Sequence, residues 1–431
     1  MIIDLNNKKH RDLITKLIKE YYFRLTTYNN MEEYYNGNTK ANREYKLTDR
    51  SNRKARVKYI KKFVNEETSF AVGNPITYNS VDKEKIDNIN YIINNQIAQL
   101  DIENANTLGE FGCTYEMHYL SNGEFKIKTL RPKEAIAYRN TEGEVELFLY
   151  FYQRELDDNK YIDVIDDNYI YQFVEGNLQP YNVIQHIFGK CPVGVGSFLN
   201  GVEDTIYADI HELVDLYEET LWDCSNNIAD LRASYMVLTG CSLDEEEAKK
   251  MKRMGILQLP DSSGKAEWLT KNLESDFCNN LIEKIEDLIY QQSSHINHNV
   301  VMASNTSGVA LSSRLISLRN KVTILQKSLQ ELVKTRLRDI CTYYNVVFNK
   351  EYDYRDIKII FTMNLPQDDV SMAQIITQLN GKLSAETGLN QLSFVQDAKN
   401  EYRKALEEQQ QAMDINNVDL DNLEGVDNET I

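Results

Sequence analysis

The stretch "NVVMASNTSGVALSSRL", residues 299–315, separates the two strongest helical patterns of the chain and so decides how the fold is divided. After it, apolar residues alternate at three and four positions from Leu311 to Tyr344, which predicts a helix on the order of 50 Å long. Within it, residues 303–308 are small and uncharged, which predicts a loop over 299–310. Before it, residues 276–295 place one apolar face at helical spacing: Leu281, Ile285, Leu288 and Ile289.

Another helix and a compact insert precede this region. From residue 203 onward, apolar residues recur at a spacing near 3.6, which predicts a helix within 201–235. In "CSLDEEEAKKMKRMG", Ser242 and Glu245 form a capping-box pattern and Gly255 supplies the stop, which predicts a short helix. The following "ILQLPDSSGKAEWL" predicts a hairpin of strands 256–259 and 266–269. The order is therefore helix, small α/β insert, helix.

The parts of the chain before and after these helices show both helical and strand patterns. Residues 11–35 and the basic segment 50–73 predict helices, whereas 112–190 alternates with a period of two and is broken by "SNGE", "NTEG" and "VEGN". That region is expected to be antiparallel β structure. "DIKIIFTMNLP" predicts one strand that ends at Pro366, and short helices follow up to residue 411. The acidic residues 412–431 predict a disordered tail, and the fold class is α+β.

The net charge of −18 is unevenly distributed. Residues 1–65 carry 16 Lys and Arg against 7 Asp and Glu, whereas the rest of the chain carries a net charge of −27. The segments 201–235 and 276–298 together hold 13 acidic residues and two basic ones. Because duplex affinity comes largely from Lys and Arg that neutralise phosphates, this composition argues against a conventional DNA-binding protein.

The compartment follows from three observations. No run of about 18 apolar residues exists, so we expect no membrane span. The start "MIIDLNNKKHRD" lacks the apolar region of a signal peptide, so the protein is expected to stay in the cytosol. The 6 cysteines lie far apart without a CxxC pair, which favours reduced thiols over disulfides or a zinc site.

No motif indicates catalysis. The segment "SSGKAEW", 262–268, lacks the upstream Gly and the following Ser or Thr of a phosphate-binding loop. His295 and His298 could share a metal ion, but polar residues at a helix end are the simpler interpretation. The acidic cluster 163–167 is more typical of strand edges and turns than of a nuclease site. We therefore predict no catalytic residue, no metal and no cofactor.

Several segments resemble the portal proteins of tailed bacteriophages, of the type found in long-tailed phages of Gram-positive hosts. The resemblance extends from about Tyr34 to Glu401. It rests on the order of these segments: "YYNGN" (34–38), "VKYIKKFVNEETSFAVGNPITY" (57–78), "LGEFGCTYEMHY" (108–119), "KCPVGVGSFLNGVEDTIYADIHELVDLYEETLWDCSNNIAD" (190–230) and "NTSGVALSSRL" (305–315).

The resemblance implies a portal fold and a ring, usually of twelve subunits, at one capsid vertex. In this sequence it implies a wing (1–200 and 311–365), stem helices (201–235 and 276–298), a clip (236–275), a tunnel loop (299–310), a crown (366–411) and the acidic tail (412–431). The protein would reside in the virion, and in the host cytoplasm during assembly.

The resemblance also implies sites and partners. Double-stranded DNA would be packaged and ejected through the ring, past the tunnel-loop residues Met302, Ala303, Ser304, Asn305, Thr306, Ser307 and Gly308. The clip would bind partners through Asp261, Ser262, Ser263, Gly264 and Lys265. The implied partners are the terminase large subunit, the major capsid protein, the scaffolding protein and the head-completion adaptor.

Two alternatives remain open. One is a phage DNA-processing enzyme whose acidic residues bind Mg²⁺, and the other is a helical adaptor that never contacts nucleic acid. The ring interpretation makes sense of the charge, because an acidic ring with an uncharged loop would let a polyanion slide, whereas a basic channel would hold it. The oligomeric mass distinguishes the three hypotheses, since only the first requires a ring of about a dozen subunits.

Overall fold

The computed structural model describes most of the chain. Its described residues are 1–46, 52–96, 99–177, 179–231, 235–239, 244–246, 249, 265–269, 275–297, 315–364, 369–379, 381–389, 392, 395, 398 and 401–410. They divide into two compact units, one of residues 1–300 with 317–364 and the other of residues 301–316 with 365–431. No helix among the described residues has the length and apolar character that crossing a membrane requires.

Five helices form the N-terminal part together with a short strand, β1 (Thr77–Asn79). They are α1 (Lys8–Tyr35), α2 (Lys40–Glu44), α3 (Tyr59–Val72), α4 (Lys83–Asn94) and α5 (Leu100–Phe111). The helix expected in 11–35 is confirmed as α1. The helix expected in 50–73 is confirmed only from Tyr59 to Val72, as α3, since the described residues 52–58 are not helical. Helix α5 ends at Gly112, where φ is 75° and an added Cβ would collide with the carbonyl oxygen of Gly201, so only glycine fits this turn.

The expected β region is confirmed as two antiparallel sheets. One has the order β3 (Glu124–Leu130), β2 (Cys113–Ser121), β9 (Val193–Ser197). The other has the order β4 (Ala135–Arg139), β5 (Val145–Gln153), β6 (Lys160–Ile165), β7 (Tyr169–Val174), β8 (Asn182–Gln185). Asn122 and Gly123 both have positive φ between β2 and β3, which is the tight hairpin turn that "SNGE" predicts.

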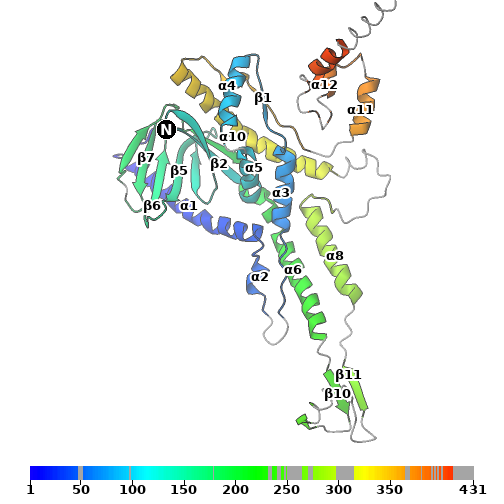
Figure 1. The fold of residues 1–431 in the computed structure, drawn as a ribbon. Helices are drawn as coiled ribbons and strands as arrows, with labels where there is room; N and C mark the ends of the chain where they lie inside the picture. Colours follow the sequence, from blue (N-terminus) through cyan, green and yellow to red (C-terminus); the bar gives the residue numbers. More distant parts are fainter. Residues whose placement is uncertain are drawn as a thin grey trace, which may run out of the picture. The chain divides into compact units, whose positions relative to one another are not determined.

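Helices cover these sheets (Figure 1). Helix α1 packs Ile14, Leu17 and Tyr21 against the apolar residues of the five-stranded sheet. The long helix α10 (Ile316–Phe348) crosses β9, where a Cβ added at Gly194 would lie 2.9 Å from the Leu332 carbonyl oxygen. The absence of a side chain at Gly194 therefore allows α10 to pack closely on β9.

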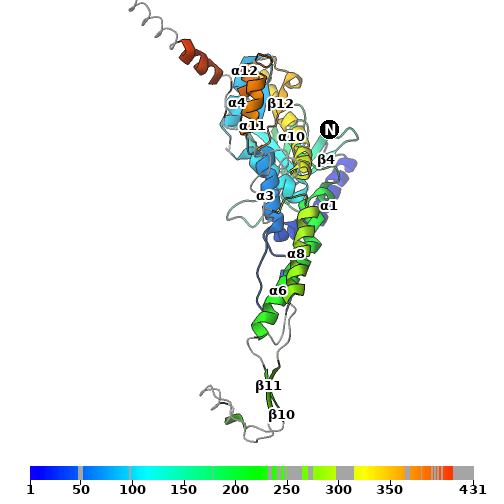
Figure 2. The same ribbon diagram turned by 90° about the vertical axis from the view of Figure 1, so that its right-hand side faces the viewer.

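The predicted helix–insert–helix order is present. After the short η1 (Gly201–Asp204) come α6 (Ile206–Leu231) and later α8 (Ser275–Gln292), which lie side by side in both views (Figures 1 and 2). Between them, β10 (Tyr235–Thr239) pairs antiparallel with β11 (Lys265–Leu269). The expected pairing of 256–259 with 266–269 remains a prediction, because residues 256–259 lie outside the described part; the partner that the structure gives β11 is β10.

The chain returns to the N-terminal part before it enters the second unit. β12 (Lys358–Ile360), which follows η2 (Tyr354–Asp356), pairs antiparallel with β1. It confirms a strand in "DIKIIFTMNLP", but the strand ends at Ile360 rather than at Pro366. The second unit contains α11 (Asp369–Gln378), α12 (Ala385–Leu389) and a helical segment at 401–410. The acidic residues 412–431 lie outside the described part of the chain.

Candidate functional site

Helices α6 and α8, with the hairpin and the loop that they carry, are the segments that the sequence singles out for function. Ile206, Ile210 and Val214 of α6 share one core with residues of α8 and α3, namely Ile285, Ile289, Tyr290, Ile60 and Phe63. The buried face expected on α6 is therefore confirmed. The helix pair is fixed on α3 and does not form a free two-helix arm.

The expected face of α8 needs a correction. Ile285 and Ile289 are 3% and 0% exposed, but Leu281 and Leu288 are 37% and 43% exposed. Phe277, on the same side of the helix, is 63% exposed. The 3.6-residue period cannot tell a face covered within one protomer from an adjacent apolar face that is left uncovered. We call Phe277, Leu281 and Leu288 the exposed α8 stripe.

Two acidic residues of α6 are engaged by the N-terminal chain: Glu218, which is buried, and Asp215, which is half-buried. Glu218 is fully buried and accepts hydrogen bonds from the Thr39 hydroxyl and, at 2.9 Å, from the Val57 backbone N–H. Asp215 accepts from the Tyr34 hydroxyl at 2.7 Å and from the Ala41 N–H at 3.0 Å. Burial raises the pKa of Glu218. These carboxylates hold the N-terminal chain against α6.

The segment that packs against α6 belongs to the basic N-terminal region of the sequence. We call residues 39–58 the wrapping segment, of which 39–46 and 52–58 are described. The indole N–H of buried Trp222 donates to the Ala55 carbonyl at 2.8 Å. The Lys54 ammonium lies 5.6 Å from the Trp222 ring centroid, which is a cation–π contact. The positive charge of Lys54, one of those in the N-terminal region, is thus engaged in a contact within the protomer.

A second set of acidic side chains remains exposed on the helix pair. On α6 these are Asp209, Glu212, Glu219 and Asp223, and on α8 they are Asp276, Glu283 and Asp287. Asp209 forms an ion pair with Lys321 of α10 at 2.7 Å, and Asp223 accepts a hydrogen bond from the Tyr45 hydroxyl at 2.6 Å. The helix pair therefore presents carboxylates to solvent and retains a negative surface.

His295 is buried and packs against an aromatic ring. Its ring stacks on Phe63 with 4.2 Å between the ring centroids, and its Nδ1 lies 2.8 Å from the Ser293 carbonyl. Burial lowers the pKa of His295 to about 4, so the ring is neutral at pH 7 and Nδ1–H donates to that carbonyl. His298 lies outside the described residues, among which no cluster of three or more His, Cys, Asp or Glu could hold a metal ion.

A buried ionic network fixes α10 to β2 and α5. The Arg336 guanidinium makes two hydrogen bonds of 2.7 Å to the Glu116 carboxylate and one of 2.8 Å to Asp101. His118 lies between Glu116, at 3.0 Å, and Asp339, at 2.7 Å. Sequence analysis missed this network because its members alternate with ordinary strand and helix residues and form no local motif.

Electrostatics within the network favour the charged forms of Glu116 and His118. Burial acts to raise the pKa of Glu116, but the Arg336 charge and hydrogen bonds lower it to about 2. Burial acts to lower the pKa of His118, but hydrogen bonds to Asp339 and Glu116 raise it above its ordinary value. Arg338 pairs with Asp339 at 2.7 Å. With His118 protonated, the charges of the network balance. The cations are His118, Arg336 and Arg338, and the carboxylates are Glu116, Asp101 and Asp339.

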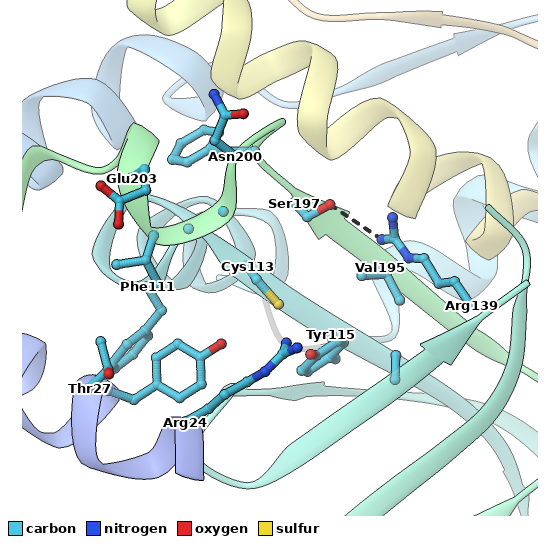
Figure 3. A pocket seen from close by; sticks show the side chains of 16 residues that line it. Arg24, Thr27, Phe111, Cys113, Tyr115, Arg139, Val195, Ser197, Asn200 and Glu203 are labelled. Carbon is cyan, nitrogen blue, oxygen red and sulfur yellow. Dashed lines mark hydrogen bonds between the residues drawn. The ribbon is translucent and has the colours of Figure 1, made fainter. Parts of the chain in front are cut away.

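A cavity of about 600 Å³ opens beside α1, β2, β9 and η1 (Figure 3). Arg24, Arg139 and Glu203 contribute charged groups to its wall, and Arg139 lies 3.4 Å from the Ser197 hydroxyl. Burial raises the pKa of the Cys113 thiol to about 11, so this thiol is protonated at pH 7. A protonated thiol is a weak nucleophile and no histidine lines the cavity, so we assign it no catalytic role.

The residues expected to contact DNA and partners lie mostly outside the described part. This holds for all of Met302, Ala303, Ser304, Asn305, Thr306, Ser307 and Gly308, and for Asp261, Ser262, Ser263 and Gly264. Lys265 is described as the exposed first residue of β11, opposite Thr239. These two groups of site residues remain predictions.

Comparison with known proteins gives a consistent result. The model of the family described as "Phage portal protein, SPP1 Gp6-like" matches residues 14–414. The portal protein of Bacillus phage SPP1 is 21% identical over 398 residues, which are 85% of this chain and 78% of that protein. The portal protein of Clostridium phage phiCD119 is 22% identical over 380 residues, which are 80% of this chain and 82% of that protein.

Two solved structures of gene transfer agent particles also match. A chain in the neck of an empty particle is 9% identical with a TM-score of 0.48, covering 76% of this chain and 87% of its own length. A chain in the virion of the native particle is also 9% identical, with a TM-score of 0.45, covering 76% of this chain and 86% of its own length.

Proposed function

The chain belongs to the SPP1 Gp6-like phage portal proteins, and on this premise we propose that it forms a ring of about twelve subunits at one vertex of a phage capsid. Double-stranded DNA passes through this ring during packaging and ejection. The observation that carries the proposal is the family match over residues 14–414, since this range includes α6, the β10–β11 hairpin, α8 and α10.

The parts of the molecule then take the following roles. The two sheets with α1, α3, α5 and α10 form the wing, and α6 with α8 forms the stem. The β10–β11 hairpin belongs to the clip, 236–275, although β10 already begins at Tyr235. Residues 366–411 form the crown, and residues 299–310, which join α8 to α10, form the tunnel loop that faces DNA.

Neighbouring subunits meet along the exposed α8 stripe in this proposal. Phe277, Leu281 and Leu288 recur at the spacing of one helical side and remain exposed in the protomer. On α6, Leu216 is also 48% exposed, between Glu212 and Glu219. Burial of such side chains between copies yields about 25 cal/mol per Å² of apolar area, repeated at every interface of a closed ring.

The acidic surface of the helix pair suits passage of DNA rather than its capture. The stem segments 201–235 and 276–298 carry 13 acidic and two basic residues per subunit. Of these, Glu218 and Asp215 are bound by the wrapping segment, and the exposed carboxylates supply the negative surface. A duplex carries one charge per about 1.7 Å of axis, so such a surface offers it no phosphate anchors.

The partners follow from these assignments. The clip binds the head-completion adaptor and the terminase large subunit through the turn Asp261–Gly264 with Lys265. The wing meets the major capsid protein and, during assembly in the host cytoplasm, the scaffolding protein. In this proposal the chain has no catalytic residue and no cofactor, because it acts as a conduit and a docking platform in the virion.

Substitution of the exposed α8 stripe tests the ring directly. Leu288→Asp should leave the protomer folded, since Leu288 is 43% exposed, but a charge at every interface should convert rings into monomers. Asn280→Asp adds the same charge to an exposed position of α8 without removing an apolar side chain, so it should keep the ring. Native mass spectrometry and negative-stain microscopy measure assembly, and circular dichroism checks folding.

The outcomes separate the parts of this proposal. Wild-type protein that stays monomeric with purified scaffolding and capsid proteins would overturn the portal function. Normal rings of Leu288→Asp would instead show that the exposed α8 stripe is not the interface, with the portal function still standing.

A further inference from the structure

The two sides of helix α6 are covered by segments of opposite charge. On one side, the wrapping segment follows α6 from Asp215, which accepts from the Ala41 N–H at 3.0 Å, to Asn226, which accepts from the Arg53 N–H at 2.8 Å. On the other side lies α8, and Figure 1 shows α2, which belongs to the wrapping segment, and α8 on opposite sides of α6. Each side of the helix pair thus has its own outer surface.

The wrapping segment forms a basic surface. Its described residues include seven bases and one acid. All of these bases except Lys54 are exposed: Lys40, Arg43, Lys46, Arg53, Arg56 and Lys58. Arg43 pairs with Glu33 inside the protomer, but among the described residues no ion pair holds Arg53 or the three exposed lysines. This surface therefore keeps positive charge for a partner.

Helix α8 forms an acidic surface on its outer side. Asp276, Glu283 and Asp287 are exposed and recur at intervals of seven and four residues, so they lie in one row, which we call the acidic row. Glu283 and Asp287 each stand two residues from buried Ile285, which places them about 160° around the helix from it. The acidic row adjoins the exposed α8 stripe, so the outer side of α8 combines carboxylates with apolar side chains.

Both surfaces cover the same stretch of the helix pair. Val214 of α6 and Ile285 of α8 share one core. From this core toward the β10–β11 hairpin, the wrapping segment follows α6 as far as Asn226, over about 18 Å, and α8 extends back to Asp276, over about 14 Å. The basic and the acidic surface therefore match in position and length.

We propose that the exposed bases of the wrapping segment in one subunit bind the acidic row and the exposed α8 stripe of the next subunit. This inference rests on the proposed ring and names the two surfaces that close it. A ring is built from head-to-tail contacts, in which two different surfaces of the same chain meet. Opposite charges on opposite sides of α6 meet this requirement, and they reject the wrong pairing of two like surfaces.

A second copy of the chain fits the outer side of α8 better than DNA does. Lys and Arg side chains can cover apolar surface with their alkyl stems while their charged ends pair with carboxylates. The wrapping segment therefore suits both the acidic row and the exposed α8 stripe. A duplex offers no positive charge to the acidic row, because its backbone is a polyanion.

The test exchanges charge between the two surfaces. Lys46→Glu with Arg53→Glu makes the wrapping segment acidic, and Glu283→Lys with Asp287→Lys makes α8 basic. Each double variant alone brings like charges together, so the concentration at which half of the chains assemble should rise at least about tenfold. An equimolar mixture should assemble as the wild type does, because every interface of an alternating ring then pairs opposite charges. Native mass spectrometry at low salt measures assembly.

A matched control changes the same charge elsewhere. Lys16→Glu with Lys19→Glu replaces two exposed bases of α1, outside both surfaces, and should assemble as the wild type does. Circular dichroism checks that each variant is folded.

A second measurement uses the wild type alone. Rings are formed from equal amounts of ¹⁵N-labelled and unlabelled chains and treated with a carbodiimide, which activates a carboxylate for attack by a lysine amine with net loss of one water. We expect amide links from Lys40, Lys46 or Lys58 to the acidic row. Links between subunits join one labelled peptide to one unlabelled peptide.

The outcomes distinguish this inference from the proposed function. Wild-type protein that stays monomeric with scaffolding and capsid proteins would overturn the ring and this pairing together. Rings of either charge-reversed variant at wild-type concentrations, or a mixture of the folded variants that fails to assemble, would overturn the pairing and leave the portal function standing. Wild-type rings whose wrapping-segment lysines link between subunits only to acids outside α8 would do the same, even if a variant fails to fold.

Discussion

Arg336 shows how a single residue can decide the position of a helix longer than thirty residues. Its guanidinium contacts Glu116, Asp101 and Tyr78, and so joins α10 to the strand and helix that support it. Ion pairs of this kind add little net stability compared with apolar packing, but loss of one partner leaves an uncompensated buried charge. The network therefore makes the position of α10 specific.

Replacement of Arg336 should be severe. Arg336→Met keeps the volume but leaves the buried Glu116 without its cation, so the free energy of unfolding should fall by about 3–5 kcal/mol. Lys334→Met, on the exposed side of the same helix, should change it by less than about 1 kcal/mol. Urea unfolding followed by circular dichroism measures both. Similar losses for the two variants would contradict the assigned role.

His118 predicts a pH dependence of stability. Its folded pKa is raised above the ordinary value, so its contribution is fully present below the unfolded pKa of about 6.5 and is lost as pH rises through the folded pKa. The difference in unfolding free energy between wild type and His118→Gln should therefore shrink as pH rises above about 6.5. Unfolding curves across that range measure it, and a difference that grows with pH would show that His118 is neutral in the fold.

At the scale of elements, the wrapping segment and α8 fix the position of α6. In the wrapping segment, the Thr39 hydroxyl and the Val57 N–H donate hydrogen bonds to Glu218, and the Ala55 carbonyl accepts one from Trp222. One face of α6 is therefore covered by polar groups of this segment rather than by a second apolar helix. Helix α8 covers another face through Ile285 and Ile289. The third face, with Leu216 and the exposed acidic residues, is the one that we propose faces other subunits and DNA.

Substitutions in the tunnel loop should affect DNA packaging through their charge more than through the shape of the side chain. Asn305→Lys would add one base per subunit, about a dozen at the constriction, each able to pair with a phosphate. Rings should form normally, while packaging should slow and recover as salt screens the contacts. Asn305→Ser should package normally. The measurement is DNA packaged per head at two salt concentrations.

An alternative role for this segment gives the opposite result. If Ser307 and Asn305 only cap the following helix, Ser307→Ala should lower stability by about 1 kcal/mol. Asn305→Lys would then leave packaging untouched. Normal packaging by Asn305→Lys at low salt would remove the tunnel-loop role from this residue.

The insert between α6 and α8 should be a docking surface. Deletion of Asp261–Gly264 should leave the ring intact, because these residues belong to the insert and lie outside α6 and α8 in the sequence. Adaptor binding should be abolished, since the deletion removes the proposed contact residues. Size-exclusion chromatography of ring and adaptor measures binding, and a ring that still binds adaptor would assign this hairpin no docking role.

At the scale of the whole molecule, a conduit needs no chemistry of its own. The cavity of Figure 3 holds a protonated Cys113 and no histidine, and the sequence lacks a phosphate-binding loop. We expect purified rings to show no ATP hydrolysis, with energy for packaging supplied by a separate terminase. A phosphate-release assay with and without added terminase measures this. Turnover that follows the ring through a second purification step would instead favour an enzyme.

Local pattern by itself determined a large part of this protein. The periods of 3.6 and two indicate α1, α3, α6, α8, α10 and the β region, and "SNGE" indicates the turn at Asn122 and Gly123. The order of its segments indicates the portal family. Helix and turn formation depend on residues within a few positions of each other, so a single sequence contains that information.

Only the tertiary structure decided which groups meet. It buries Glu218 under the wrapping segment, leaves Leu288 exposed and pairs β10 with β11. It also assembles Arg336, Glu116 and His118 from segments more than two hundred residues apart. Each of these contacts depends on how distant elements pack, and the period of a helix or strand fixes which residues share a face but not what that face touches.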